Sequence, residues 1–203
     1  MSYIDIDSLI RPLGVTSLFR LRNKQTFEPK EMFHIPFEDR YKVGTQRYSF
    51  PGLPCLYMGS SIDVCKEEVF GSKDIESQEY SIAQYRVNNE NSPKILDLSY
   101  FFDLDFDYMN ASDRTIFMKI LPLIALCSVR CSYPVNEKIG FRTEYIIPQM
   151  LLQYIMDSKH FKTGEVIGIK YRSVYHMHDI WNDETKKDKW NNYVFPAISN
   201  HTT

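Results

Sequence analysis

The sequence predicts a mixed α/β (α+β) fold, and three observations predict it. Segments with the alternation of strands and segments with helical spacing follow in the order strand, helix, strands, helices, strand, without a regular βαβ repeat. The 203 residues have the length of one domain. Hydrophobic residues make up 43% of the chain and aromatic residues 14%, so the core needs no disulfide or metal to support it.

The first predicted strand covers residues 17–22, Ser-Leu-Phe-Arg-Leu-Arg. Alternation along a strand places Leu18, Arg20 and Arg22 on one face. A second short strand, buried on both faces, is expected at residues 53–58 after a Pro-Gly turn. Two cationic side chains therefore point to one side of an otherwise apolar strand.

A helix is expected directly after this second strand. Ser60 or Ser61 can cap its N-terminus, because a serine hydroxyl accepts from the first free backbone N–H groups. The helix runs through Val69, and Gly71 stands where a C-terminal cap belongs.

The remaining strands are predicted from alternation and turn residues. Residues 79–87 and 94–98 are expected to form a hairpin or to lie side by side, and the last strand, 193–196, is expected at a sheet edge. The strands predicted in this part of the chain are 79–87, 94–98, 166–171 and 193–196.

Two longer helices are predicted between these strands. One opens at Ser112-Asp113 and continues to about Arg130, with a kink or a break at Pro122. The other runs from Glu144 to Ser158 and tolerates its proline only in the first turn. The residues expected on its buried face are Ile147, Leu151, Tyr154 and Ile155.

Charge and composition exclude several classes of protein. The chain has 24 Lys and Arg against 26 Asp and Glu, a net charge of −2, which argues against a nucleic-acid-binding protein. The longest apolar tract, residues 116–129, is too short to span a membrane. The N-terminal residues lack a signal-peptide pattern, so a cytoplasmic protein without membrane contact is expected.

Few residues have the spacing of a known catalytic or metal-binding motif. The sequence has no phosphate-binding glycine loop and no nucleophile-elbow or metalloprotease pattern. His176 and His178 could share a strand face, but no third ligand is spaced nearby. Cys127 and Cys131 are interpreted as small buried residues. No metal site is predicted.

Three side chains are candidates for a site. Arg20 faces inward from an apolar strand, which is costly unless an anion or a carboxylate pairs with it. Arg47 precedes Tyr48 just before a turn, and Glu68 lies on the capped helix. Two guanidinium groups and one carboxylate favour a phosphate-bearing ligand.

Five short motifs together resemble the RES domain, a family named for an Arg, a Glu and a Ser. The match covers residues 17–174, with residues 175–203 as a C-terminal tail of a single RES-like domain. The motifs are Phe19-Arg-Leu-Arg22, Gln46-Arg-Tyr-Ser49, Pro54-Cys-Leu-Tyr57 with Glu68-Val69, Tyr145-Ile-Ile-Pro-Gln149 and Gly168-Ile-Lys-Tyr-Arg-Ser173.

The resemblance implies an ADP-ribosyltransferase-like fold, in which two small sheets flank an NAD cleft. It further implies a toxin of a bacterial toxin–antitoxin pair that degrades NAD, with an Xre-like antitoxin as partner. The chain departs from the family at Thr45-Gln-Arg-Tyr48, where the family has Gly-Gly-Arg-Trp, and it carries an insertion at Phe33-His-Ile-Pro-Phe37.

The resemblance also gives roles to residues. Arg20, Glu68 and Ser173 are expected to be catalytic, with Glu68 stabilising positive charge on the ribose and Ser173 bonding the nicotinamide amide or a ribose hydroxyl. NAD is the expected substrate and inorganic phosphate a possible co-substrate, with no resident cofactor. The residues expected to bind substrate are Arg47, Tyr48, Tyr57 and Arg22.

The expected reaction is release of nicotinamide by phosphorolysis or hydrolysis, and three alternatives stay open. An ADP-ribosyltransferase would place ADP-ribose on a macromolecule. A non-catalytic module would bind a partner through the acidic and aromatic residues 101–108. A metal-dependent enzyme would use His176 and His178.

Overall fold

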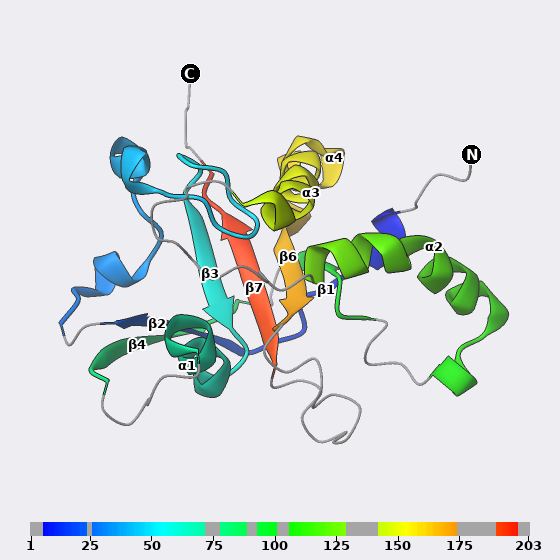
Figure 1. Ribbon diagram of the computed structural model, residues 1–203, viewed down its shortest axis with the longest axis horizontal. Coiled ribbons are helices and arrows are strands. Elements are labelled where there is room, and N and C mark those ends of the chain that lie inside the picture. The colour runs from blue at the N-terminus through cyan, green and yellow to red at the C-terminus, as the bar shows by residue number, and fades with distance from the viewer. Residues whose placement is uncertain are drawn as a thin grey trace.

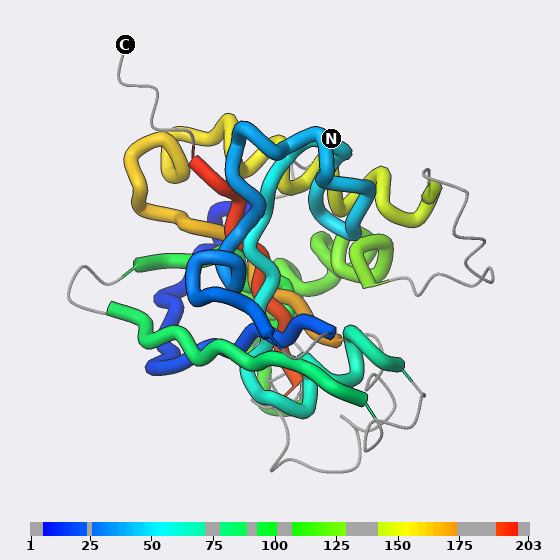
Figure 2. Tube along the Cα trace, turned by 90° about the vertical axis from the view of Figure 1, so that its left-hand side faces the viewer, coloured from blue at the N-terminus to red at the C-terminus, as the bar shows by residue number. Residues whose placement is uncertain are grey.

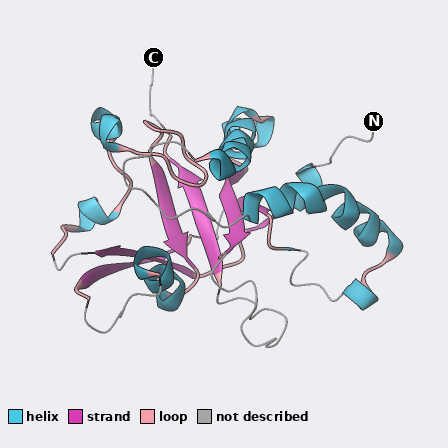
Figure 3. Cartoon of the chain, in the orientation of Figure 1, coloured by secondary structure: helices cyan, strands magenta, loops and turns pink. Residues whose placement is uncertain are grey.

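The computed structural model describes residues 6–23, 26–71, 78–88, 93–100, 106–128, 142–173 and 190–198. Seven strands form one sheet in the order β1-β5-β6-β7-β3-β2-β4, accompanied by helices (Figures 1 and 3). The predicted α+β class is confirmed.

The strands pair antiparallel except β5 and β6, which are parallel. Their bounds agree with the predicted segments within a few residues, and β1 is an additional strand. The seven strands are β1 (Ile10–Pro12), β2 (Ser17–Asn23), β3 (Cys55–Gly59), β4 (Tyr80–Arg86), β5 (Lys94–Asp97), β6 (Val166–Arg172) and β7 (Asn191–Pro196).

The sheet is nearly divided where β3 meets β2. Only one residue pair, Phe19 with Gly59, registers these two strands, whereas β2 and β4 pair along their whole length. In Figure 1 the central strands β3, β7 and β6 run upright while β2 and β4 lie across them, and Figure 2 shows β4 beside β2 at the edge. The resemblance to the RES domain implies two small sheets, and the structure has one sheet in two parts.

The helices lie between the strands in sequence and cover parts of the sheet. The α-helices are α1 (Ile62–Phe70), α2 (Ala111–Ser128), α3 (Ile146–Asp157) and α4 (Lys159–Lys162). Short 3₁₀ turns precede several of them or stand in loops: η1 (Ile6–Leu9), η2 (Pro29–Met32), η3 (Phe37–Lys42), η5 (Phe106–Tyr108) and η6 (Thr143–Tyr145).

Helix α1 begins and ends where its capping residues predict. The Ser61 side chain accepts a hydrogen bond from the Val64 N–H at 3.2 Å, which satisfies one of the free donors of the first turn. Gly71 ends the helix with φ 61°, a conformation that costs glycine little. Val64 and Cys65 are buried against the sheet, so this helix is fixed next to β2 and β3.

Helices α2 and α3 form the main core with one face of the sheet. Pro122 lies inside α2, which continues through it without a break, and Pro148 lies in the first turn of α3 as predicted. Tyr154 was expected on the buried face of α3, but it is 57% exposed. The core residues of the two helices are Ile120, Ile124, Cys127, Leu151, Leu152 and Ile155.

Two predictions of strand position are wrong. β4 and β5 are not neighbours, because β4 closes one edge of the sheet and β5 lies near the other. β7 is not an edge strand: it lies between β6 and β3. Pro196 is tolerated there because it is the last residue of the strand. The expected C-terminal tail therefore contributes a central strand.

Candidate functional site

Glu68, from the last turn of α1, bonds to two strands that follow far later in the chain. Its Oε1 atom accepts a hydrogen bond from the Ser173 hydroxyl at 2.7 Å and another from the Asn192 Nδ2 at 2.6 Å. The carboxylate thus joins α1 to the end of β6 and to β7. We call Glu68, Ser173 and Asn192 the Glu68 centre.

The two donors of the Glu68 centre are held by the sheet. Ser173 directly follows β6, is fully buried, and donates its backbone N–H to the Trp190 carbonyl at 2.9 Å. Asn192 is 5% exposed and lies opposite Gly59 on one side and Tyr171 on the other. Because strand ladders fix the direction of each side chain, both donors are aimed by the backbone.

Tyr171 lies between the Glu68 centre and the turn that carries Arg47. Its ring packs against Tyr48 with centroids 4.6 Å apart. Burial raises the pKa of the Tyr171 hydroxyl well above its usual value, the Glu68 carboxylate raises this pKa further and the Arg47 guanidinium lowers it. An anion and a cation therefore act on the same buried hydroxyl from two segments of the chain.

A side chain of α3 holds the turn at residues 46–49 in place by hydrogen bonds. The Gln149 amide nitrogen, Nε2, donates to the Gln46 carbonyl at 2.9 Å and to the Ser49 carbonyl at 3.2 Å. Gln149 is 6% exposed, so these bonds form away from water, where losing them would be costly.

Tyr57 of β3 also stabilises this turn by hydrogen bonds. Its hydroxyl accepts from the Tyr48 N–H at 3.2 Å and contacts the Ser49 hydroxyl at 3.1 Å. Burial raises the pKa of this hydroxyl above its usual value. Tyr57 therefore acts as a neutral hydrogen-bonding group that orders the turn before Arg47 contacts any ligand.

Arg47 extends from this turn toward α2 and η6. Its Nη1 donates to the Cys127 carbonyl at 3.2 Å, and its guanidinium carbon lies 5.4 Å from the centre of the Tyr145 ring. Arg142 lies 5.3 Å from the centre of the same ring and donates to the Tyr145 hydroxyl at 3.2 Å. Two cationic groups thus share one aromatic side chain, an arrangement in which cation–π attraction stabilises both.

Arg20 and Arg22 lie in a different part of the sheet. Phe19 pairs with Gly59, and Gly59 pairs with Asn192, so the side chains of Phe19 and Asn192 point to the same face of the sheet. Strand alternation therefore places the Arg20 side chain on the opposite face of β2. Arg22 donates to the Phe33 carbonyl at 3.3 Å. No hydrogen bond or ion pair joins Arg20 to Glu68 within the described ranges.

Arg20 is nevertheless an unusual arginine. Burial, and next the charge of Arg22, lower the pKa of Arg20 to about 10. Its Nη1 is buried and has no hydrogen-bond partner among the residues that the structure describes. Arg20 and Glu68 both act on the Cys65 thiol, whose pKa is raised to about 11, chiefly by burial.

The structure thus gathers five of the seven predicted site residues. Glu68 and Ser173 are in contact, and Arg47, Tyr48 and Tyr57 lie around Tyr171, next to the Glu68 centre. Arg20 and Arg22 stand apart on β2. The roles of all seven remain predictions.

Sequence reasoning gave no role to three residues of this site. Tyr171 and Gln149 stand within the quoted motifs, and Asn192 lies outside all of them. One signal for Asn192 was present, since the pair Asn191-Asn192 directly precedes the apolar run Tyr193-Val-Phe-Pro196, and buried amides require partners. The partner itself lies 124 residues away and has no local signature.

The two alternative functions, a metal-dependent enzyme and a non-catalytic binding module, depend on residues outside the Glu68 centre. His176 and His178 lie outside the described residues, as does most of the segment 101–108. Within the part of the chain that the structure covers, no three His, Cys, Asp or Glu side chains form a group that could hold a metal ion. None of the described helices is both long and apolar enough to cross a membrane.

Comparison with known proteins adds one relative. The chain is 37% identical over 182 residues to a protein of Bacillus subtilis (strain 168) named "Putative toxin YopC". The similarity covers 83% of this chain and 38% of that protein, so the chain spans well under half the length of its relative. No protein-family model and no solved structure matches the chain.

Proposed function

We propose that the chain is a toxin that releases nicotinamide from NAD, with Glu68 as the catalytic carboxylate. The similarity to a protein named as a toxin supports the toxin role. The observation that carries the enzymatic proposal is the Glu68 centre, in which a carboxylate far from its donors in sequence is oriented by two short hydrogen bonds. Such pre-orientation is typical of catalytic groups.

The chemistry that this site would perform needs no general acid. The bond between the ribose carbon and the nicotinamide nitrogen breaks, and its electron pair neutralises the pyridinium ring, so the leaving group departs uncharged. Positive charge develops on the ribose, where an ionised Glu68 would stabilise it. The oxygen of phosphate, or the oxygen of water with loss of one proton to solvent, then bonds to the same carbon.

Arg47 is the residue proposed to bind the phosphates of the substrate. A guanidinium presents paired N–H donors that match phosphate oxygens. Tyr171 pairs with Asn192 of the Glu68 centre and its ring packs against Tyr48, the neighbour of Arg47, which supports binding of one ligand by Arg47 and Glu68. Arg20, with its buried donor, is predicted from the sequence to bind phosphate as well, but it lies on the opposite face of β2, so its contribution is tested separately.

The test is incubation of the purified protein with NAD, with and without inorganic phosphate, followed by identification of products by mass. Glu68→Gln keeps the hydrogen-bonding shape but removes the charge, and turnover should fall about 10²–10³-fold, as it does when a transition-state electrostatic contact is lost. Glu67→Gln is the matched control, one position away on the same helix, and should retain turnover.

Each outcome of the NAD assay supports or refutes one part of the proposal. NAD consumption by Glu68→Gln at the wild-type rate, with an unchanged melting curve, would refute the assignment of Glu68. ADP-ribose attached to protein or nucleic acid would indicate a transferase instead. Loss of turnover in Arg20→Ala would extend the site to β2, while unchanged turnover would restrict it to the groups around Tyr171.

A further inference from the structure

We propose that Ser173 and Asn192 are positioning residues, which hold Oε1 of Glu68 so that its second oxygen, Oε2, is the one that faces the ribose. This inference rests on the proposed function and assigns roles within the same site. It makes β7, which lies beyond the segment that resembles the RES domain, a component of that site.

The first argument is the count of donors and acceptors. A serine hydroxyl has one proton to donate, and that of Ser173 is directed at Oε1. The Asn192 amide nitrogen is directed at the same atom. Bonds of 2.6–2.7 Å to a carboxylate are of the short, charge-assisted kind. Oε2 accepts no hydrogen bond from any residue that the structure describes.

This count changes the role expected for Ser173. With its only proton donated to Glu68, the hydroxyl has no donor left for the nicotinamide carbonyl or for a ribose oxygen. Ser173 is also fully buried. It therefore acts through Glu68 instead of binding the substrate with its own proton.

The second argument is the rigidity of Asn192. Its backbone lies in a strand with a neighbour on each side, opposite Gly59 of β3 and Tyr171 of β6. Gly59 has no side chain, and there is no room for one, because a Cβ at this position would lie 2.8 Å from the Cys65 sulfur. The missing side chain lets α1 approach β3 closely, and this brings Glu68 within reach of the amide.

A separation of kcat from KM tests the positioning role. Ser173→Ala and Asn192→Ala should each lower kcat for NAD, by up to about 10²-fold, because a misplaced catalytic group costs that much, while KM stays within twofold. Asn191→Ala is the matched control, since the neighbouring side chain points to the other face of the sheet. A raised KM with unchanged kcat would overturn the assignment.

NAD binding to an inactive protein provides a second readout. In a Glu68→Gln background, Ser173→Ala should leave the Kd for NAD unchanged, because the serine does not touch the ligand. A Kd weakened tenfold or more would show that Ser173 contacts the substrate directly, and would overturn the positioning role.

The pH profile provides a third readout. Asn192→Asp places a second carboxyl beside Glu68, and two adjacent carboxyl groups resist losing both protons. The acid limb of NAD turnover should therefore move to higher pH, with activity recovering as the pH rises. An acid limb at its wild-type position would contradict the contact between residues 192 and 68.

Thermal unfolding separates this inference from the proposed function. If the wild type consumes no NAD, the function fails, but the contacts can still be measured as Tm changes of Glu68→Ala, Ser173→Ala and the double variant. Coupled residues should give a double variant whose Tm shift is smaller than the sum of the single shifts. Additive shifts would refute the coupling whatever the enzymatic result.

Discussion

Gly168 in β6 lies where the backbone of β7 leaves no space for a side chain. A Cβ at this position would lie 2.3 Å from the Val194 carbonyl oxygen and 2.9 Å from the Phe195 ring. The neighbouring atom is backbone, so it cannot rotate away. The close approach of β6 and β7 that brings Ser173 and Asn192 to one carboxylate depends on this glycine.

Gly168→Ala should therefore destabilise the fold by about 1–3 kcal/mol, the usual cost of inserting a group into a packed core. Denaturant unfolding monitored by circular dichroism measures the change. Gly44→Ala is the control, because no atom lies within 4 Å of the added Cβ. Equal stability of the two variants would show that β6 and β7 can separate without cost.

At the residue scale, the sequence predicts those site residues that stand in local motifs. Ser61 and Gly71 define the helix of Glu68, and alternation places Ser173 at the end of a strand. Asn192 could not be predicted, since its role depends on a carboxylate 124 positions away. Arg20 is expected from the sequence to join Glu68, but the register of Phe19 with Gly59 and strand alternation place Arg20 on the opposite face of β2.

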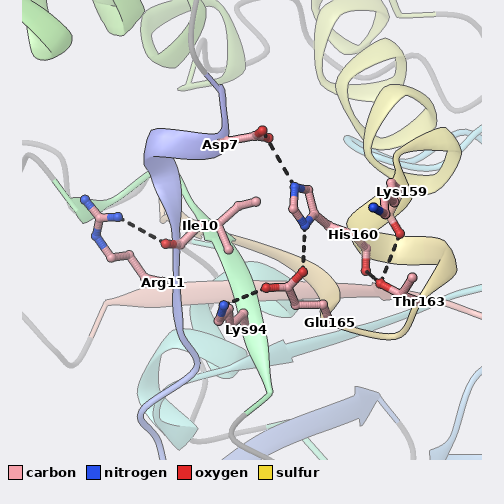
Figure 4. Close-up of polar contacts among 8 residues, drawn as sticks. All are labelled: Asp7, Ile10, Arg11, Lys94, Lys159, His160, Thr163 and Glu165. Atoms are coloured by element: carbon pink, nitrogen blue, oxygen red, sulfur yellow. Dashed lines mark hydrogen bonds and ion pairs between the residues drawn. The ribbon is translucent and has the colours of Figure 1, made fainter.

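Three elements and the turn before β6 are joined by one polar network away from the proposed site. His160 of α4 bonds through Nδ1 to Glu165 at 2.6 Å and lies 3.6 Å from Asp7 of η1, while Lys94 of β5 bonds to Glu165 at 2.6 Å (Figure 4). The hydrogen bond to Glu165 is the main cause that raises the pKa of His160. Lys94 first, and then His160, lower the pKa of Glu165 to about 2.

This network should stabilise the fold only within a pH window. The His160 contribution is complete below its ordinary pKa of 6.5 and is lost as the pH rises through the raised value. The Glu165 contribution is complete above its ordinary value of 4.5 and is lost as the pH falls toward 2. The Tm difference between the wild type and His160→Gln should therefore be largest between pH 4.5 and 6.5.

Salt provides the control for this prediction. These side chains are accessible to solvent, so added NaCl should reduce the Tm difference by screening. A Tm difference that is the same at every pH and salt concentration would mean that His160 acts by packing alone.

At the element scale, prediction is accurate where the signal is local. Most predicted strands and helices are present, because alternation, caps and turn residues act within a few positions. The neighbours of a strand are not local information: β4 and β5 follow each other in sequence yet lie near opposite edges. Pro196 suggested an edge strand, although at the end of β7 it disturbs no central hydrogen bond.

The whole molecule depends on its last described strand. β7 fills the position between β6 and β3, and its residues Tyr193 and Val194 belong to two different hydrophobic clusters. Without β7, the parallel pair β5–β6 would have no link to β3 and β2. The segment 17–174 that resembles a known domain therefore does not contain a complete core.

A chain that ends at residue 174 should accordingly fail to show a cooperative melting transition. Removal of β7 exposes apolar surface on both neighbouring strands, a loss that a marginally stable domain cannot absorb. A chain that ends at residue 198 is the control and should melt as the full chain does. Cooperative unfolding of the shorter chain, measured by calorimetry, would contradict the central position of β7.

The order in which the strands are synthesised has a consequence for a chain that is still on the ribosome. The strand that closes the sheet is the last of the seven to be translated, so the nascent polypeptide holds Glu68 without its amide partner until residue 192 has emerged. If the Glu68 centre cleaves NAD, a nascent chain cannot do so before residue 192 has emerged from the ribosome and β7 has taken its place between β6 and β3.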